Sequence, residues 1–141
     1  MVTVKRFTYD DKDLMHLSND IRRVVFIEEQ HVTPEIEYEH EEEGHYYLLF
    51  IDDMPVATAR WRITTKGIKL ERFAMLRDFR NKGLGSILLE EVLKDVIPMD
   101  REIYLHSQVA AVNYYTRAGF RESGDRFMEA DIEHVLMKYQ K

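Results

Sequence analysis

The pattern of apolar and polar residues changes its period along the chain, which indicates strands and helices in mixed order. Residues 2–8 alternate weakly, as in a strand. After Asp11, apolar residues beginning with Leu14 and Leu17 recur every three or four positions, as on one face of a helix. The sequence therefore predicts a strand followed by a helix, with an irregular connection over residues 31–45.

Apolar runs in the middle of the chain are separated by short polar turns, as in an antiparallel meander of strands. The runs cover residues 46–51, 56–63 and 68–76. Downstream, the pattern predicts a helix that ends near residue 97 before Pro98, a strand at 102–106, a helix at 110–118, and strands at 120–127 and 132–139. The order is mixed α/β, and neither a repeat nor a change of composition divides residues 1–141 into more than one domain.

Composition and charge narrow the function classes. The chain of 141 residues contains no cysteine, so disulfides and thiolate-metal sites are excluded. Its net charge is −6 and no stripe of Lys and Arg accompanies aromatic residues, so we expect no nucleic-acid partner. The first residues do not resemble a signal peptide, and no apolar run approaches the roughly 20 residues of a membrane span. We therefore expect a soluble, cytoplasmic protein with no membrane partner.

A loop with two glycines joins the third strand of the meander to the next predicted helix. Its sequence is Arg80-Asn81-Lys82-Gly83-Leu84-Gly85-Ser86. Unpaired N–H groups and the positive end of the helix dipole form an anion site at such a helix start, and glycine lets the backbone approach a phosphate. The loop lacks the Gly-Lys-Ser/Thr of a Walker motif, and Leu88 stands where a dinucleotide fingerprint requires glycine. By itself, the loop is equally compatible with an ordinary turn.

Two motifs in this order resemble those of the GNAT acetyltransferase superfamily. Arg80-Asn81-Lys82-Gly83-Leu84-Gly85 resembles its Arg-x-x-Gly-x-Gly motif A. Ala111-Val112-Asn113-Tyr114-Tyr115-Thr116-Arg117-Ala118-Gly119-Phe120 resembles its A-x-x-F-Y-x-K-x-G-F motif. Residues 22–30 and 133–137 look like segments of the ElaA/YjcF-like branch, so the resemblance covers nearly the whole chain.

The resemblance implies a fold, a cofactor and a reaction. The implied fold is an α/β, mostly antiparallel splayed sheet of six or seven strands with helices on both faces and acetyl-CoA in the splay. The implied reaction is direct transfer of the acetyl group to a primary amine, with no metal. We expect a small-molecule amine as acceptor. A protein or peptide amine and a coenzyme A-binding domain without catalysis are the alternatives, and a homodimer is left open.

The resemblance also assigns residues to the coenzyme. Tyr115 matches the tyrosine that protonates the leaving thiolate as general acid. Gln108 stands roughly where many members have Asn, which leaves that coenzyme contact open. The predicted coenzyme-binding residues are Ala74, Met75, Leu76, Arg80, Asn81, Lys82, Gly83, Leu84, Gly85, Ser86, Asn113 and Tyr115.

Two residues are candidates for the catalytic base. Glu71 lies on the strand that leads to the loop and shares a face with Lys69 by strand alternation. The catalytic glutamate of the family would align with Lys69, however, and Glu71 could instead pair with Arg60 or Arg72. His134 lies in the middle of a strand, and the ordinary pKa of imidazole, about 6.5, suits a proton acceptor that also contacts substrate.

The end of the first predicted helix and the last strand are expected to contact the acceptor, since GNAT folds place acceptor-binding residues near that helix end. The predicted substrate-binding residues are Arg22, Phe26, Glu29, Gln30 and His134. The first three share a helical face at spacing i, i+4 and i+7. His40 and His45 flank acidic residues, but their spacing does not fit a helical zinc motif, so we predict a solvated acidic loop there.

Overall fold

The computed structural model describes residues 1–140 and contains one open sheet of eight strands. The strands are β1 (Val2–Thr8), β2 (His45–Ile51), β3 (Met54–Thr64), β4 (Gly67–Met75), β5 (Ile103–Gln108), β6 (Phe120–Glu122), β7 (Phe127–Glu129) and β8 (Ile132–Tyr139). The helices are α1 (Lys12–Arg22), α2 (Pro34–Glu37), α3 (Leu84–Val96) and α4 (Val112–Arg117). A π-helical segment, η1 (Arg23–Glu29), continues α1, and the short 3₁₀ turns are η2 (Glu41–Glu43), η3 (Arg77–Phe79), η4 (Ile97–Met99) and η5 (Val109–Ala111).

The sheet confirms the predicted mixed, mostly antiparallel class. Its order is β1-β2-β3-β4-β5-β8-β6, with β7 also paired to β8, and β4–β5 is the parallel pair among the described strands. The structure has eight strands rather than six or seven because the strand predicted at 120–127 is divided into β6 and β7. Gly124 lies between them with a φ of 105°, which a continuous strand does not accommodate.

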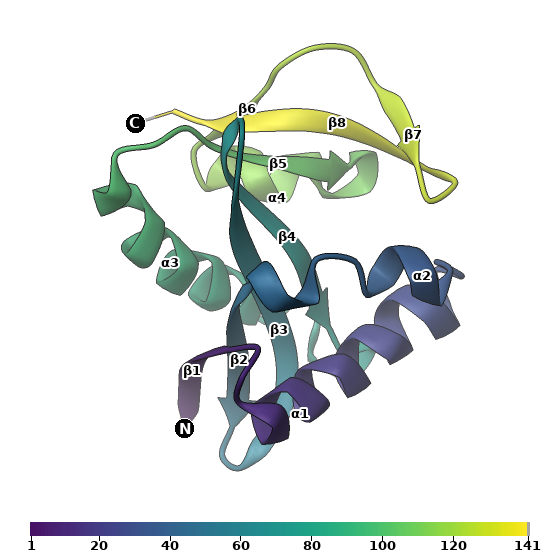
Figure 1. Cartoon of the computed structure of the whole chain (residues 1–141), viewed down its shortest axis with the longest axis vertical. Coiled ribbons are helices and arrows are strands. Elements are labelled where there is room, and N and C mark those ends of the chain that lie inside the picture. Colours follow the sequence, from purple (N-terminus) through teal and green to yellow (C-terminus); the bar gives the residue numbers. More distant parts are fainter. Residues whose placement is uncertain (141) are drawn as a thin grey trace.

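The splay between β4 and β5 arises because the two strands pair over a short stretch only. Their register covers three pairs, from Ile68–Ile103 to Leu70–Leu105, and the strands then run in different directions (Figure 1). Beyond this stretch, β4 contains a bulge at Arg72, which has a φ of 58°. The bulge and the loss of pairing open the sheet at its middle.

Two cores pack against opposite faces of the sheet, because side chains of β2 alternate between them. Tyr47 and Leu49 face α3, whereas Tyr46 and Leu48 face α1. Figure 1 accordingly shows α1 and α3 on opposite sides of the central strands. Helices therefore cover both faces, as expected. No helix within residues 1–140 is long and apolar enough to cross a bilayer.

Candidate active site

A cavity of about 210 Å³ lies where β4 and β5 part. Its wall consists of residues from these strands, η1, α2, α4 and the hairpin of β7 and β8. The predicted site residues that line it are Phe26, Gln30, Glu71, Tyr115 and His134. The fold therefore brings together candidates from four segments that are far apart in the sequence.

Tyr115 reaches the cavity from α4 and is 9% exposed. Its ring makes edge contacts with Phe73 and Phe120, which fix its orientation. Its hydroxyl makes no hydrogen bond to any residue in the described part of the chain, 1–140. Burial raises the pKa of this phenol, so the hydroxyl keeps its proton at neutral pH. The arrangement supplies a proton donor at the cavity wall.

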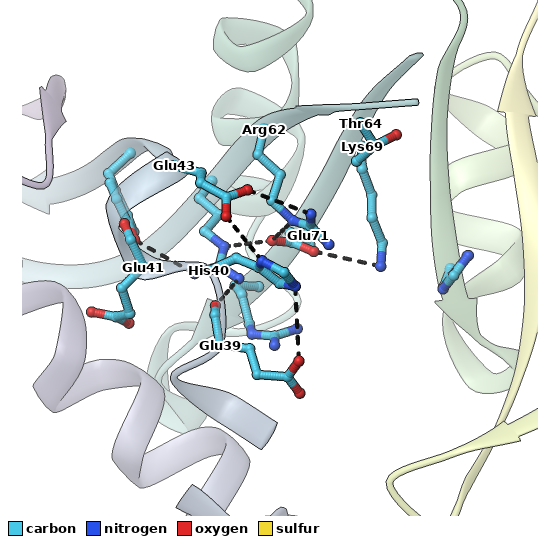
Figure 2. Close-up of polar contacts among 12 residues, drawn as sticks. Glu39, His40, Glu41, Glu43, Arg62, Thr64, Lys69 and Glu71 are labelled. Atoms are coloured by element: carbon cyan, nitrogen blue, oxygen red, sulfur yellow. Dashed lines mark hydrogen bonds and ion pairs between the residues drawn. The ribbon is translucent and has the colours of Figure 1, made fainter. Parts of the chain in front are cut away.

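Glu71 lies on the same wall, but its carboxylate is held by cations. Oε2 accepts from Nε of Arg60 at 2.6 Å and from Nε of Arg62 at 3.0 Å. Nζ of Lys69 is 3.5 Å from Oε1, which confirms that the two residues share a face (Figure 2). Burial alone would raise the pKa of Glu71, but the surrounding cations, Arg60 foremost, lower it to about 2. A carboxylate of such low basicity is a poor proton acceptor near pH 7.

Arg22, a predicted substrate-binding residue, lies behind the cavity rather than on its wall. It is 1% exposed, and its guanidinium donates to Glu37 at 2.9 Å and pairs with Glu41 at 2.8 Å. Arg72 also donates to the carbonyl of Glu37, at 3.1 Å. The bonds of Arg22 fasten α2 and η2 to α1, and the bond of Arg72 fastens α2 to β4. The arginines thereby fix the segment that covers one side of the cavity.

The acidic segment after α2 makes contacts of its own above Glu71. His40 has Nδ1 3.1 Å from Glu43 and Nε2 3.8 Å from Glu39, and Glu43 also lies 3.9 Å from Arg62 (Figure 2). His45 instead stacks on Trp61, away from His40. No group of three or more His, Cys, Asp or Glu side chains within residues 1–140 is placed to hold a metal ion.

Glu29 and Arg80, predicted for acceptor and coenzyme respectively, contact each other. Nη2 of Arg80 lies 3.1 Å from both carboxylate oxygens of Glu29, and its Nε donates to the carbonyl of Met75 at 2.8 Å. This pair ties the end of η1 to the glycine loop. Glu29 therefore lies beside the predicted coenzyme loop and outside the cavity wall.

The glycine loop leads directly into the first turn of α3. Gly83 caps α3 with a φ of 79°, makes no side-chain cap bond, and has open space where a Cβ would stand. The hydroxyl of Tyr114 donates to the carbonyl of Gly85 and holds the first turn of α3 against α4. The first N–H groups of a helix have no partner within the helix, and Lys82 beside them is exposed.

The other predicted coenzyme-binding residues vary in exposure. Ala74 and Leu84 are buried, and Met75 and Leu76 are partly buried. The exposed ones are Asn81, Ser86 and Asn113. The buried apolar residues can offer hydrogen bonds to a ligand only through their backbone groups. Side-chain hydrogen bonds to the coenzyme are therefore expected from the exposed polar residues.

The cavity also contains polar residues that the sequence did not single out. His106 and Glu129 line it, with Nδ1 of His106 3.1 Å from Oε1 of Glu129. Gln108, noted only as a departure from the family motif, donates to Gln30 at 2.9 Å. Alternation along β5 places His106 and Gln108 on one face. This pattern could have identified His106 as a cavity residue. No local pattern pointed to Glu129, since the predicted strand ended before it.

Known proteins with similar sequence or structure identify the family. Residues 9–141 match the family model described as an acetyltransferase (GNAT) domain. The Bacillus subtilis protein YyaT is 38% identical over 96% of this chain and 94% of its own length. The Bacillus subtilis N-acetyltransferase YjcF is 31% identical over 83% of this chain and 86% of its length.

The fold comparison agrees with the sequence comparison. The crystal structure of Escherichia coli ElaA superposes with a TM-score of 0.88, at 19% identity, over 99% of this chain and 100% of that one. YjcF, after which the predicted branch is named, is thus a sequence relative, and ElaA shares the fold. The chain belongs to the GNAT acetyltransferase family and is an acyl-CoA-dependent acetyltransferase.

Proposed function

We propose that this acetyltransferase transfers an acetyl group from acetyl-CoA to the primary amine of a small molecule, which binds in the cavity between β4 and β5. The observation that carries the proposal is the cavity itself. It is about 210 Å³ in volume, lies at the splay, and combines a buried phenol with imidazole and carboxylate groups. This volume is below that of drug-sized ligand pockets, which favours a small acceptor over a peptide.

The glycine loop suits the pyrophosphate of the donor. The first-turn N–H groups of α3 and the side chain of Lys82 would hold the phosphates, and Gly83 leaves room for their close approach. Arg80 would also bind a phosphate once its guanidinium releases the carboxylate of Glu29. Bound acetyl-CoA supplies the activated thioester, while the protein supplies position and proton transfer.

The protonation states of the cavity residues indicate which residue acts as general acid and which as general base. Tyr115 holds a proton at Oη and serves as the general acid for the leaving thiolate. His134 is the better base, because Glu71 is stabilised as a carboxylate by Arg60 and its neighbours. Glu71 then serves to hold the cations of the cavity wall in place. Phe26 and Gln30 supply the acceptor contacts from η1.

The test combines ligand binding with turnover. Thermal unfolding is measured with saturating acetyl-CoA, coenzyme A, ATP and NAD, and a selective rise with the first two identifies the donor. At about 100 times the dissociation constant the gain should be roughly 2.7 kcal/mol. Thiol release is then followed with a panel of small primary amines and a panel of peptides.

Each outcome separates the candidate functions. Release with small amines supports the proposal, whereas release with peptides alone would replace the acceptor class. Coenzyme binding without release in any mixture would favour a binding domain without catalysis. Absence of any thermal response to acetyl-CoA and coenzyme A would contradict the donor assignment.

A further inference from the structure

Glu129 lies between two imidazoles at the cavity wall. Its Oε1 accepts a hydrogen bond from Nδ1 of His106 in β5 at 3.1 Å, and its Oε2 is 3.8 Å from Nε2 of His134 in β8. The side chain of Glu129 is 40% exposed, so a ligand can reach it. The hydrogen bond from His106 lowers the pKa of the Glu129 carboxyl, which therefore faces the cavity as a carboxylate.

The tautomer of His134 follows from its other nitrogen. Nδ1 is 2.7 Å from the carbonyl oxygen of Ile132, which can only accept, so Nδ1 carries the hydrogen. In the neutral ring, Nε2 then presents a lone pair. Nε2 and Oε2 of Glu129 are thus two hydrogen-bond acceptors 3.8 Å apart, and neither has a hydrogen-bond donor among residues 1–140. A group with two or more hydrogen-bond donors can therefore bridge the two acceptors.

The hairpin that carries Glu129 is built to hold it in place. Ala130 and Asp131 form its two-residue turn with φ values of 51° and 62°, a left-handed conformation that disfavours residues with a Cβ. The turn fixes the register Glu129–Ile132 and Phe127–His134. The ring of Phe127 stacks near His134, with 6.0 Å between centroids, and meets His106 edge-on at 5.1 Å.

We propose that Glu129 and His134 together bind the acceptor as an ammonium ion, so that the site selects cationic primary amines. This inference rests on the proposed function. The ammonium donates one N–H to Oε2 of Glu129 and another to Nε2 of His134. The second proton then moves to Nε2, which gives an imidazolium beside the carboxylate and leaves a neutral amine with a free lone pair.

The charges around the pair support this sequence of events. Glu129 faces His106 from β5, His134 from β8 and, at longer range, Lys69 from β4. Its negative charge stabilises both the incoming ammonium and the imidazolium that replaces it. The positive charge therefore stays next to Glu129 while the proton moves over one hydrogen bond.

The experiment compares Glu129→Gln with Glu133→Gln, which changes an exposed carboxylate on the same hairpin. The panel consists of alkylamines and arylalkylamines. Glu129→Gln should raise the KM for these amines about 10-fold or more without altering the KM for acetyl-CoA. Glu129→Asp keeps the charge and should recover much of the loss, which a purely structural role would not require.

A second measurement decides the inference without acetyl transfer. The Cε1–H signals of the histidines are titrated by NMR, with and without the same amines. Glu129→Gln should abolish the shift of the His134 signal on adding amines, because the ammonium loses its carboxylate partner beside the ring. If Glu129→Gln matches Glu133→Gln in both measurements, the inference is overturned. If the wild type acetylates no amine, the proposed function fails, while the NMR titration still decides the role of Glu129.

Discussion

The proposed active site has two halves, the glycine loop and the cavity, and they are built differently. The loop is a continuous segment, residues 80–86, and its backbone N–H groups are the proposed phosphate ligands. The cavity is made of side chains from six separate parts of the chain. A backbone site depends on a few glycines and suits one donor, whereas a side-chain site can change its acceptor by single substitutions. The predictions below test whether the two halves respond independently.

The largest effect is expected in the cavity half, from Arg60→Met. Arg60 is fully buried and donates to Glu71 at 2.6 Å and to the carbonyl of Glu39 at 2.7 Å. Its loss leaves a buried carboxylate without its strongest partner and should reduce the free energy of unfolding by about 3–5 kcal/mol. Urea denaturation measures the loss, and calorimetry should find coenzyme A affinity unchanged in the folded protein.

The exposed Arg101 provides the control for this change. Arg101→Met should alter stability by no more than about 0.5 kcal/mol. If both variants lose the same stability, the buried ion pairs do not hold the cavity together. If Arg60→Met weakens coenzyme A binding, the two halves are coupled.

The same ion pairs predict how stability depends on pH. The pKa of Glu71 is lowered from 4.5 to about 2, so its carboxylate stabilises the folded state fully above pH 4.5. This contribution, up to about 3 kcal/mol, is lost as the pH falls from 4.5 toward 2. Urea denaturation at several pH values should show a steeper acid loss in the wild type than in Glu71→Gln. Parallel curves would show that Glu71 is not the responsible group.

The adjacent tyrosines of α4 test most directly whether the two halves are independent, because one tyrosine is assigned to each half in the proposal. Tyr115→Phe removes the proposed acid and should lower kcat by about 10²-fold while acetyl-CoA affinity is kept. Tyr114→Phe removes the hydrogen bond to the carbonyl of Gly85 and should weaken acetyl-CoA binding with little change in kcat. Steady-state kinetics separate the two effects. An equal loss of kcat in both variants would remove the assignment of Tyr115 as the acid.

Much of the fold could be predicted because its signals are local. Short turns and apolar runs indicated β2, β3 and β4, and helical spacing before Pro98 indicated α3. The predicted strand at 120–127 was wrong because it ran through Gly124, whose φ is positive. The π-helical geometry of η1 and the bulge at Arg72 were not foreseen, since neither changes the apolar pattern enough to be recognised.

The site was predictable where a motif, a segment resembling the family or strand alternation carried it. Tyr115 lies in such a motif and reaches the cavity. Glu129 and His106 meet through the pairing of β5, β7 and β8, which no short segment encodes. Arg22 and Glu29 had suitable spacing on one helical face, but tertiary contacts with Glu37 and Arg80 engage them in ion pairs. Periodicity predicts which residues share a helical face. It does not predict which side chains from other elements pair with them, because that depends on the whole fold.

The smallest expected effect concerns the glycines, and it isolates the donor half. Gly83 and Gly124 both have positive φ, 79° and 105°, and neither would place a Cβ within 4 Å of another group. Replacement by Ala should therefore cost each variant about 1–2 kcal/mol of stability through the same backbone strain. Only Gly83→Ala adds a methyl group where a phosphate would approach the first turn of α3.

Coenzyme A affinity, measured by calorimetry well below the unfolding temperature, should thus fall about 10-fold in Gly83→Ala and stay constant in Gly124→Ala, a difference of about 1.4 kcal/mol. The KM for the amine at saturating acetyl-CoA should be the same in both variants. Equal losses of affinity would trace the effect to general strain. The glycine loop would then be an ordinary turn, and the phosphates would have to bind elsewhere in the splay.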